Sequence, residues 1–372
     1  MTAPDDSAAA AARKAKGVST GERRRTLDPD NLAPLTAWLT SELAATRVTV
    51  TEAVVLHGGA VQENWRLEVE CEGGAHPGRH SWVLRTDAAA RIPLSIDRAS
   101  EFAVLQAAHR AGVTVAEPIA RCPDPRVIGA PFLIQRLAPG VAQGRRIVRD
   151  PRIAAFGPSL AEDLGRALAR IHAMTPSSVA LPALTLPIRP AAHTEVQRLR
   201  AALDTSADAR PALEYVLSWL DRNAPERRPL ALVHGDFRTG NYLVEDGRLI
   251  AVLDWEFAHW GDPAEDIGWL CARCWRFGAD TREVGGIADR EPLYRGYDSV
   301  SEEPLDRRVV PFWEIFALAK WATVAVLQGD RYRSGGETAL ELALTGLMPP
   351  EMELDALDLI ESIEAQGGVP WR

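Results

Sequence analysis

Lysine is nearly absent from this chain of 372 residues. Its lysines are Lys14, Lys16 and Lys320, so the long stretch between Lys16 and Lys320 contains none. Arginine must therefore supply the positive charge of any binding site in that stretch. Because the guanidinium group is a planar fork of donors and not a point charge, a site built on arginine needs more room than a site built on lysine.

Cysteine is also scarce, and this excludes a disulfide-based fold. Cys71, Cys122, Cys271 and Cys274 are too few and too scattered for a disulfide framework in a chain of this size. Cys271 and Cys274 form one C-x-x-C, but no second Cys or His pair follows it. Their spacing favours one buried turn of helix over a metal or redox site.

Long apolar runs are missing as well. The longest apolar stretch near the C-terminus, residues 313–327, is interrupted by Glu314 and Lys320 and is shorter than the ~20 residues that cross a bilayer. It therefore predicts a buried helix. The N-terminal residues include acids and lack the apolar core of a secretory signal. We expect a flexible tail over residues 1–27, a cytoplasmic protein and no membrane partner.

The formal net charge of −9 arises in the part after Pro151, where acidic residues outnumber basic ones. This balance argues against a nucleic-acid partner and suits a neutral or cationic small molecule. An acidic surface that keeps the protein soluble explains the same charge equally well. The charge alone therefore predicts no particular ligand.

Strand and helix patterns divide the chain into two lobes. Residues 28–138 contain alternating, β-branched stretches, which predict a mostly antiparallel sheet, and one helix from about Ser95 to Gly112. Residues 139–372 have mainly helical periodicity and contain one clear β-hairpin. The predicted fold class is α+β, with a small β-rich lobe, a larger helical lobe and a ligand-binding cleft between them.

The hairpin sequence LVHGDFRTGNYLVEDGRLIAVLDWE, residues 232–256, gathers polar groups at the ends of two apolar strands. Asp246 and Gly247 form a dipeptide that favours a tight hairpin turn. Folding at this turn brings Asn241 and Asp254 side by side within a residue or two. Their side-chain oxygens are hard ligands of the kind that Mg²⁺ takes.

Asp236 precedes Asn241 by five residues, on the loop that leads into the first strand of the hairpin. It is close enough to address a nucleophile beside the metal without being a metal ligand itself. An aspartate base, an asparagine five residues later and a second aspartate after a hairpin are the groups that move a phosphoryl group from ATP to a hydroxyl.

HGDFRTGN followed by LDWE resembles the catalytic and metal-binding motifs of the aminoglycoside phosphotransferase and choline kinase superfamily, small-molecule relatives of protein kinases. VLRTD, GAPFLIQRL, LDWEFAHWGDPAEDIGWL and FWEIFALAKWA are similar, in the same order, to a bacterial branch akin to the kinase-like region of certain acyl-CoA dehydrogenases. The resemblance covers nearly the whole chain after about Thr49. It implies a protein-kinase-like two-lobed fold and an ATP- and Mg²⁺-dependent phosphotransferase acting on a hydroxyl of a small molecule.

The resemblance also implies roles for the polar residues of the hairpin. Asp236 would orient the acceptor hydroxyl and take its proton late, because the transfer is largely dissociative. Arg238 would meet the γ-phosphate, and Asn241 and Asp254 would hold Mg²⁺. His234 is interpreted as a structural hydrogen-bonding residue that fixes the loop.

The small lobe would bind the nucleotide, with two departures from the protein-kinase pattern. The first is that Gly58 and Gly59 stand where a kinase phosphate loop has G-x-G-x-x-G. Backbone N–H groups beside this pair would approach a phosphate, although a simple turn explains the pair as well. Adenine would meet backbone groups near Gln135 to Leu137.

The second departure is the missing strand lysine. Arg85 in VLRTD is the candidate for the α- and β-phosphates, with Glu101 on the following helix as its ion-pair partner. Arginine can bind phosphate through two donors, and the similar branch has arginine there too. A solvated strand residue is the alternative interpretation of Arg85.

The residues after Asp254 predict how the site is completed. Asp262, Pro263 and Glu265 are typical of a capped helix N-terminus, so a helix begins soon after Asp254. No room is left for a long activation loop, which indicates a constitutively assembled site. Glu256 would either support a second metal or end the strand.

The acceptor should bind in the helical lobe, facing Asp236. Six tryptophans concentrate there, most expected in the core and one or two on the pocket wall: Trp255, Trp260, Trp269, Trp275, Trp313 and Trp321. Glu283, Asp289 and Glu291 would suit a cationic antibiotic, although a polar surface loop explains them equally well. The resemblance favours a hydroxylated metabolite, such as a hydroxyacyl thioester, over an aminoglycoside.

Two other classes of protein stay open. A pseudokinase-like nucleotide-binding protein is expected if the glycine pair and Arg85 fail to position ATP. A metal-dependent hydrolase would work without ATP and would use a transition metal held by His234, Asp236, Asp254 and His259. Asn241 and the helical lobe behind the hairpin make the hydrolase the weaker alternative.

Overall fold

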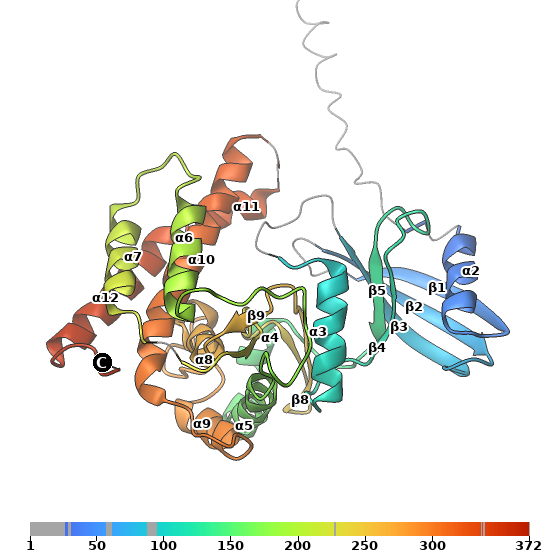
Figure 1. The fold of residues 1–372 in the computed structure, drawn as a ribbon, viewed down its shortest axis with the longest axis horizontal. Helices are drawn as coiled ribbons and strands as arrows, with labels where there is room; N and C mark the ends of the chain where they lie inside the picture. Colours follow the sequence, from blue (N-terminus) through green and yellow to red (C-terminus); the bar gives the residue numbers. More distant parts are fainter. Residues whose placement is uncertain are drawn as a thin grey trace, which may run out of the picture.

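The computed structural model describes residues 27–371, apart from 29–30, 57–61, 88–94, 227, 336 and 338. The described chain forms a smaller lobe built on a β-sheet and a larger, mainly helical lobe beside it (Figure 1). This is the α+β arrangement predicted from the sequence. The predicted tail, except for its last residue, and the pair Gly58 and Gly59 lie outside the described residues, and the bounds 28–138 and 139–372 stay predictions.

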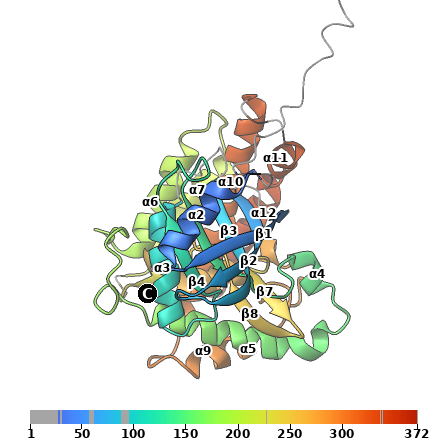
Figure 2. The same ribbon diagram turned by 90° about the vertical axis from the view of Figure 1, so that its right-hand side faces the viewer.

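A five-stranded antiparallel sheet in the order β1-β2-β3-β5-β4 forms the small lobe. Trp65, Leu67 and Val69 of β2 all point into the core beneath helix α2, because alternate side chains of a strand share a face. Figure 2 views the molecule from this side, with α2 and β1 in front. The elements of the small lobe are α2 (Ala33–Glu42), β1 (Arg47–Leu56), β2 (Gln62–Glu72), β3 (Gly78–Asp87), α3 (Arg98–Arg110), β4 (Pro118–Cys122) and β5 (Phe132–Arg136).

Helix α3 lies between the strands of the small lobe in sequence but packs into the core of the large lobe. Asp97 caps its first turn by accepting a hydrogen bond from Ser100 N at 2.7 Å. Val104 and Leu105 are buried in the same hydrophobic cluster as the helices of the large lobe. The predicted helix from Ser95 to Gly112 is therefore confirmed, and it joins the two lobes.

The large lobe is a set of helices around α10. Helix α10 contacts α6, α7, α8, α11 and α12, while α5 packs against α9. Helices α7 and α12 lie at the end far from the sheet in Figure 1. The helices are α4 (Gly144–Val148), α5 (Ile153–His172), α6 (Ala191–Leu203), α7 (Pro211–Asn223), α8 (Ala264–Cys271), η1 (Arg273–Trp275), α9 (Arg290–Asp298), η2 (Arg307–Val309), α10 (Val310–Arg333), α11 (Leu340–Thr345) and α12 (Pro349–Ala365).

The long apolar helix predicted over residues 313–327 belongs to α10. Residues 307–333 are long and apolar enough to cross a membrane, but 78% of the apolar window is buried inside the fold. Trp313 and Phe316 are almost completely enclosed. This burial is that of a core helix, as the sequence predicted.

Two short β-pairs position the residues of the hairpin sequence. Strand β7 (Tyr242–Glu245) pairs with β8 (Arg248–Val252), and the turn residues Asp246 and Gly247 have φ of 46° and 76°, as a tight primed hairpin turn requires. Strand β6 (Ala231–Val233) pairs with β9 (His259–Gly261). The predicted hairpin is confirmed, and the second pair closes the segment between residues 233 and 259 into one compact unit.

Candidate active site

The carboxylate of Asp236 accepts hydrogen bonds from three side chains. Asn241 Nδ2 donates to Oδ2 at 2.5 Å, while Trp269 Nε1 and Arg238 Nε donate to Oδ1 at 2.8 Å and 3.1 Å. The side chain of Asp236 is 15% exposed. The carboxylate is thus held in one orientation and can still be reached from solvent.

The buried side chain of Asp266 on α8 fixes the loop that carries Asp236. Its two oxygens accept hydrogen bonds from the backbone N–H groups of His234 and Gly235, at 2.8 Å and 2.9 Å, and its Oδ2 lies 3.2 Å from His172 Nε2. Burial alone would raise the pKa of Asp266, but the contacts with His172 and His234 hold the pKa below its usual value. A charged carboxylate therefore anchors the loop from inside.

His234 ties the same loop to the segment before Asp254. Its Nε2 lies 2.8 Å from Leu253 O, and its Nδ1 accepts a hydrogen bond from Asp236 N at 3.2 Å. Because Nδ1 is an acceptor, the ring proton sits on Nε2 and donates to Leu253. The side chain is fully buried and both ring nitrogens are used, so His234 has the contacts of a structural residue.

Asn241 and Asp254 lie next to each other at the open end of the hairpin, as the predicted register requires. Leu253 N donates to Asn241 O at 2.8 Å, which places Asp254 one residue from the pairing. Asp254 has a left-handed backbone with φ of 58°, which is uncommon for a residue other than glycine. Its side chain is 39% exposed.

The donors at this end fit Mg²⁺, which prefers hard oxygen ligands and takes only one or two from a protein. Asp254 offers a carboxylate. Asn241 is buried and directs its amide nitrogen to Asp236, so its amide oxygen is the atom suited to a metal. These two residues would hold the ion, and Asp236 would stay outside its ligand set.

Arg85 on β3 reaches across from the small lobe to Asp254. Its Nη2 lies 2.6 Å from Asp254 Oδ1 and 3.4 Å from Glu101 Oε1 on α3. Glu101 also pairs with Arg98. Burial alone would lower the pKa of Arg85, but Glu101, Asp254 and Glu256 outweigh burial and raise the pKa, so the guanidinium stays charged. The side chain is 5% exposed, so the alternative of a solvated strand residue is wrong.

The remaining nucleotide predictions fall on β5 and its end. Gln135 is buried within β5, between Val83 of β3 and Pro118 of β4 in the register. The backbone N–H of Leu137 donates to Ser81 O at 2.9 Å, so this donor is already used within the protein. A contact of adenine with the N–H of Leu137 would therefore require this hydrogen bond to break.

Arg238 lies between Asp236 and an aromatic ring. Its guanidinium carbon is 4.4 Å from the ring centroid of Trp275, while its Nε binds Asp236. Stacking on an aromatic face is a favourable place for an arginine. The structure thus places Arg238 beside the carboxylate of Asp236, and its contact with the γ-phosphate stays a prediction.

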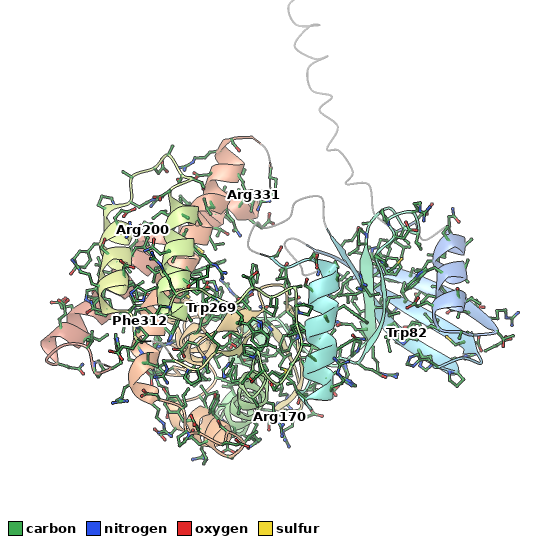
Figure 3. All side chains as sticks on the ribbon, viewed as in Figure 1. Trp82, Arg170, Arg200, Trp269, Phe312 and Arg331 are labelled. Atoms are coloured by element: carbon green, nitrogen blue, oxygen red, sulfur yellow. The ribbon has the colours of Figure 1, made fainter. Side chains whose placement is uncertain are left out.

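One tryptophan contacts Asp236, and two more pack behind it. Trp269 donates to Asp236, and Trp269, Trp275 and Trp321 pack together with ring centroids 5.4 Å and 4.9 Å apart. Figure 3 labels Trp269 in the helical lobe. Trp255 and Trp313 are buried in the core instead. The expectation that most of these tryptophans are core residues is confirmed, and the expectation that one or two form the wall of an acceptor pocket stays a prediction.

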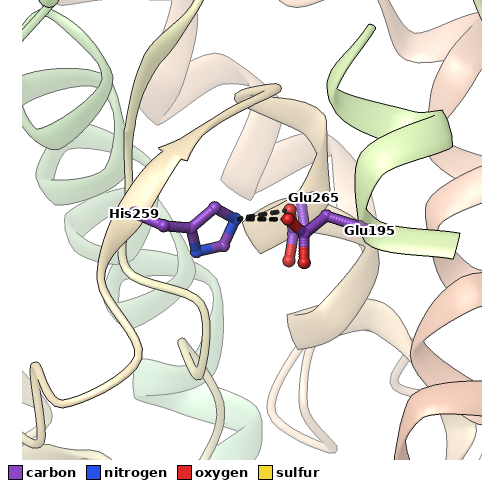
Figure 4. Close-up of side chains that lie close together, drawn as sticks. All are labelled: Glu195, His259 and Glu265. Carbon is purple, nitrogen blue, oxygen red and sulfur yellow. Dashed lines mark hydrogen bonds and ion pairs between the residues drawn. The ribbon is translucent and has the colours of Figure 1, made fainter. Parts of the chain in front are cut away.

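A second charged cluster lies behind the loop. His259 Nε2 is 3.1 Å from Glu265 Oε2 and 4.0 Å from Glu195 Oε1 (Figure 4). His259 Nδ1 lies 2.9 Å from Phe257 O. Both ring nitrogens face oxygen acceptors, so both carry protons. Burial alone would lower the pKa of His259, but the carboxylates of Glu265 and Glu195 raise it to about 9.

This cluster corrects one prediction, the metal site of the hydrolase alternative. His259 does not meet His234, Asp236 or Asp254 in a shared metal site; among the residues described, the group of carboxylates and histidines able to hold a metal is Glu195, His259 and Glu265. The hydrolase ligand set is therefore wrong. The predicted N-cap, Asp262, accepts a hydrogen bond from Ala264 N at 2.9 Å, while the side chain of Glu265 turns to His259, because a buried carboxylate gains more from a cation than from a local hydrogen bond.

Three contacts that support Asp236 or its loop were not predicted from the sequence, those of Asp266, Trp269 and Lys320. Asp266 and Trp269 lie three residues apart on α8, so both side chains point to the loop. The helical spacing within AEDIGWL would have paired them, but nothing local showed what they face. Nothing in the sequence around Lys320 indicates that its Nζ donates to Gly235 O at 2.9 Å.

Two acyl-CoA dehydrogenase family members are similar in sequence to this chain. Acyl-CoA dehydrogenase family member 10 of Mus musculus is 29% identical over 250 residues, which cover 63% of this chain and 22% of that protein. Family member 11 of Homo sapiens is 31% identical over 270 residues, which cover 66% of this chain and 32% of that protein. The chain thus spans at most about a third of the length of these relatives, as the resemblance to their kinase-like region predicts.

Solved structures share the fold. A putative aminoglycoside phosphotransferase from Ralstonia eutropha has a TM-score of 0.70 at 20% identity, covering 88% of this chain and 98% of that one. Aminoglycoside phosphotransferase APH(4)-Ia, in a ternary complex with ADP and hygromycin B, has a TM-score of 0.57 at 15% identity, with 88% and 98% covered. These similarities confirm the predicted kinase-like, two-lobed fold.

The family is established by the sequence itself. The sequence pattern of the phosphotransferase enzyme family matches residues 52–302, which is more than half of the chain. The match includes the loop of Asp236, the hairpin and the strand of Arg85. This chain therefore belongs to the phosphotransferase enzyme family.

Proposed function

We propose that this protein is a small-molecule kinase that transfers the γ-phosphate of ATP to a hydroxyl group in the presence of Mg²⁺. The observation that carries the proposal is the carboxylate of Asp236, held by three donors beside Asn241 and Asp254. These are the groups required to orient an acceptor hydroxyl next to a metal-bound phosphate. Family membership supports the same reaction class.

The residues of the chain would divide the work as follows. The acceptor hydroxyl donates its proton to Asp236, whose fixed orientation points the oxygen nucleophile at the phosphorus. The proton moves late, because little base catalysis is needed in a loose transition state. Asn241 and Asp254 would hold Mg²⁺, which supplies charge neutralisation for the phosphates when bound. Arg85 and Arg238 add positive charge on either side.

ATP as the donor is supported by the small lobe and by a neighbour. Arg85 is the buried cation of the small lobe next to Asp254, at the place where the phosphates would meet the metal. The structure of APH(4)-Ia holds ADP together with hygromycin B, and another holds AMP-PNP. An adenine nucleotide therefore suits a protein of this fold.

For the acceptor we propose a hydroxylated metabolite, such as a hydroxyacyl thioester, in preference to an aminoglycoside. Glu283, Asp289 and Glu291 are the acids that would suit a cationic antibiotic, but two of them lie within ion-pair distance of an arginine: Glu283 is 2.8 Å from Arg290, and Glu291 is 3.2 Å from Arg307. The side of Asp236 that Trp269 contacts presents Arg238, a cation. This surface suits a neutral or anionic molecule better than a polycation.

The decisive experiment is an acceptor panel assayed with ATP and GTP by following phosphorylated product. The panel contains aminoglycosides, simple hydroxylated metabolites and hydroxyacyl-CoA esters. Asp236→Ala should lower kcat by at least about 1,000-fold while Mg²⁺-ATP binds within a few fold of wild type. Asp236→Asn is the matched variant, because it keeps the shape of the side chain and removes the carboxylate.

Two results would reject the proposal. Full activity of Asp236→Ala would remove the assigned base. Tight ATP binding by the wild-type protein, with no product from any acceptor in the panel, would instead favour the pseudokinase-like alternative.

A further inference from the structure

Lys320 lies in the middle of α10, where its ammonium group is drawn into the protein. Its side chain is 16% exposed. Nζ donates to Gly235 O at 2.9 Å, lies 3.6 Å from Glu265 Oε1 and stands 4.7 Å from the ring centroid of Trp269. A lysine is a compact, strongly hydrated cation that normally keeps its head in water. Placing it here therefore requires contacts that repay the lost hydration.

The first of these contacts acts on the peptide before Asp236. Gly235 N donates to Asp266 and Gly235 O accepts from Lys320, so this residue is held at both ends. Gly235 has φ of 77°, and a Cβ at this position would come within 2.4 Å of Phe257 O. No other residue fits this conformation without a shift of the backbone. Lys320 therefore fixes the direction in which the chain enters Asp236.

The second contact acts on the carboxylate itself. The ammonium of Lys320 stands over the indole of Trp269, and the Nε1 of the same indole donates to Asp236 Oδ1 at 2.8 Å. A cation over an aromatic face attracts the ring. The position of the indole is thus coupled to the ammonium, and the position of the carboxylate is coupled to the indole.

The charge of Lys320 is balanced behind the loop. Glu265 carries the opposite charge and is shared with His259, which lies between Glu265 and Glu195. Arg198 Nη1 pairs with Glu195 Oε1 at 2.6 Å at the far end of the cluster. These carboxylates are therefore neutralised by cations of the protein. The end nearest the carboxylate of Asp236 is occupied by Lys320.

We propose that Lys320 is a positioning residue of the phosphotransferase site. This proposal rests on the proposed function. Its ammonium group fixes the position and orientation of the Asp236 carboxylate through two contacts, one with the carbonyl of Gly235 and one with the indole of Trp269. Of the residues that make these contacts, none belongs to the small lobe. Lys320 therefore affects the orientation of the acceptor and not the binding of the nucleotide.

Lys320→Met removes the ammonium and keeps an unbranched side chain of similar length. The variant should lower kcat by about 100-fold, because a small misplacement of a reacting group has effects of this size. The KM for ATP should stay within about threefold of wild type. Lys320→Arg restores a charged donor and should bring kcat back to within about tenfold of the wild-type value.

A second measurement does not depend on activity. Hydrogen–deuterium exchange followed by mass spectrometry should show the backbone amides of residues 232–242 exchanging about tenfold faster in Lys320→Met, because the loop loses one of its fixed points. Arg198→Gln is the matched control, since it removes a cation from the same cluster without touching the loop. It should leave both kcat and exchange at wild-type levels.

The outcomes separate the two proposals. A wild-type protein without transferase activity rejects the proposed function, while the exchange comparison still tests Lys320. A folded Lys320→Met with wild-type kcat and wild-type exchange overturns the positioning role, as does an equal loss in Arg198→Gln. If Lys320→Met does not fold, Trp269→Phe tests the contact through the indole, because it keeps an aromatic ring and removes the N–H that donates to Asp236. An unchanged kcat in that variant overturns the positioning role of the contact through Trp269.

Discussion

Asp236 and Asp254 stand at the two ends of the hairpin unit, yet the protein holds them in different ways. Asp236 is 15% exposed and receives three hydrogen bonds, all from residues of the large lobe. Asp254 is 39% exposed, and its ion-pair partner Arg85 comes from the small lobe. One lobe alone therefore positions Asp236, the proposed base, whereas Asp254, the proposed metal ligand, depends on both lobes. Since lobes joined in this way commonly move relative to each other, such a movement would alter Asp254 much more than Asp236.

Asp254→Ala should have the largest effect of the substitutions that test the difference between Asp236 and Asp254. We expect kcat/KM to fall by at least about 1,000-fold, because metal and nucleotide binding are lost together with the alignment of the phosphate. Asp236→Ala should lower kcat alone. Calorimetric titration of both variants with Mg²⁺-ATP separates the two cases. Wild-type affinity for Mg²⁺-ATP in Asp254→Ala would show that the two aspartates do not differ in this way.

Arg85→Lys tests the part of the Asp254 site that comes from the small lobe. Lysine keeps the charge but loses the planar fork that lies between Asp254 and Glu101. We expect the KM for ATP to rise about tenfold and kcat to change less, since kcat depends on Asp236.

Arg98→Lys is the control for Arg85→Lys, because Arg98 also pairs with Glu101. It should shift the KM for ATP less than Arg85→Lys does. Initial-rate kinetics over a range of ATP concentrations measures both variants. A larger rise in Arg98→Lys would mean that the orientation of Glu101, and not the contact with Asp254, is what ATP binding requires.

The parts of the site that depend on local sequence were predictable. The turn at Asp246 and Gly247 starts the hairpin pairing, which brings Asn241 next to Asp254 after one register shift between Leu243 and Val244. The alternating pattern of β2 likewise predicts which side chains fill the core of the small lobe. These predictions succeed because strand period and turn type act over a few residues.

The support behind Asp236 was not predictable in the same way. Asp266, Trp269 and Lys320 reach the loop from helices that follow it by 30 residues or more, as the separations of 31, 33 and 85 residues in their contacts show. Glu265 lies in the predicted capped turn of α8, but its side chain pairs with the half-buried His259 from β9. Which partner each of these side chains contacts depends on which polar and charged groups become buried together. That in turn depends on the complete fold.

The smallest expected effect concerns the cluster behind the loop and the pH dependence of stability. The pKa of His259 is raised from 6.5 to about 9 in the folded protein, because Glu265 and Glu195 outweigh the cost of burial. Binding of a proton therefore stabilises the fold. This contribution is complete below pH 6.5 and is lost as the pH rises through 9.

His259→Gln should remove this pH dependence while keeping a polar side chain. At pH 6 we expect its free energy of unfolding to be lower than that of the wild type by ~2 kcal/mol, and the difference should shrink towards pH 9. Urea unfolding at several pH values measures the difference, with exposed His109→Gln on α3 as the control. A constant difference between the two proteins from pH 6 to pH 9 would mean that His259 is not charged in the fold. The carboxylates of Glu195 and Glu265 would then depend on Arg198 and Lys320 alone, and the support of Asp236 would rest more heavily on Lys320.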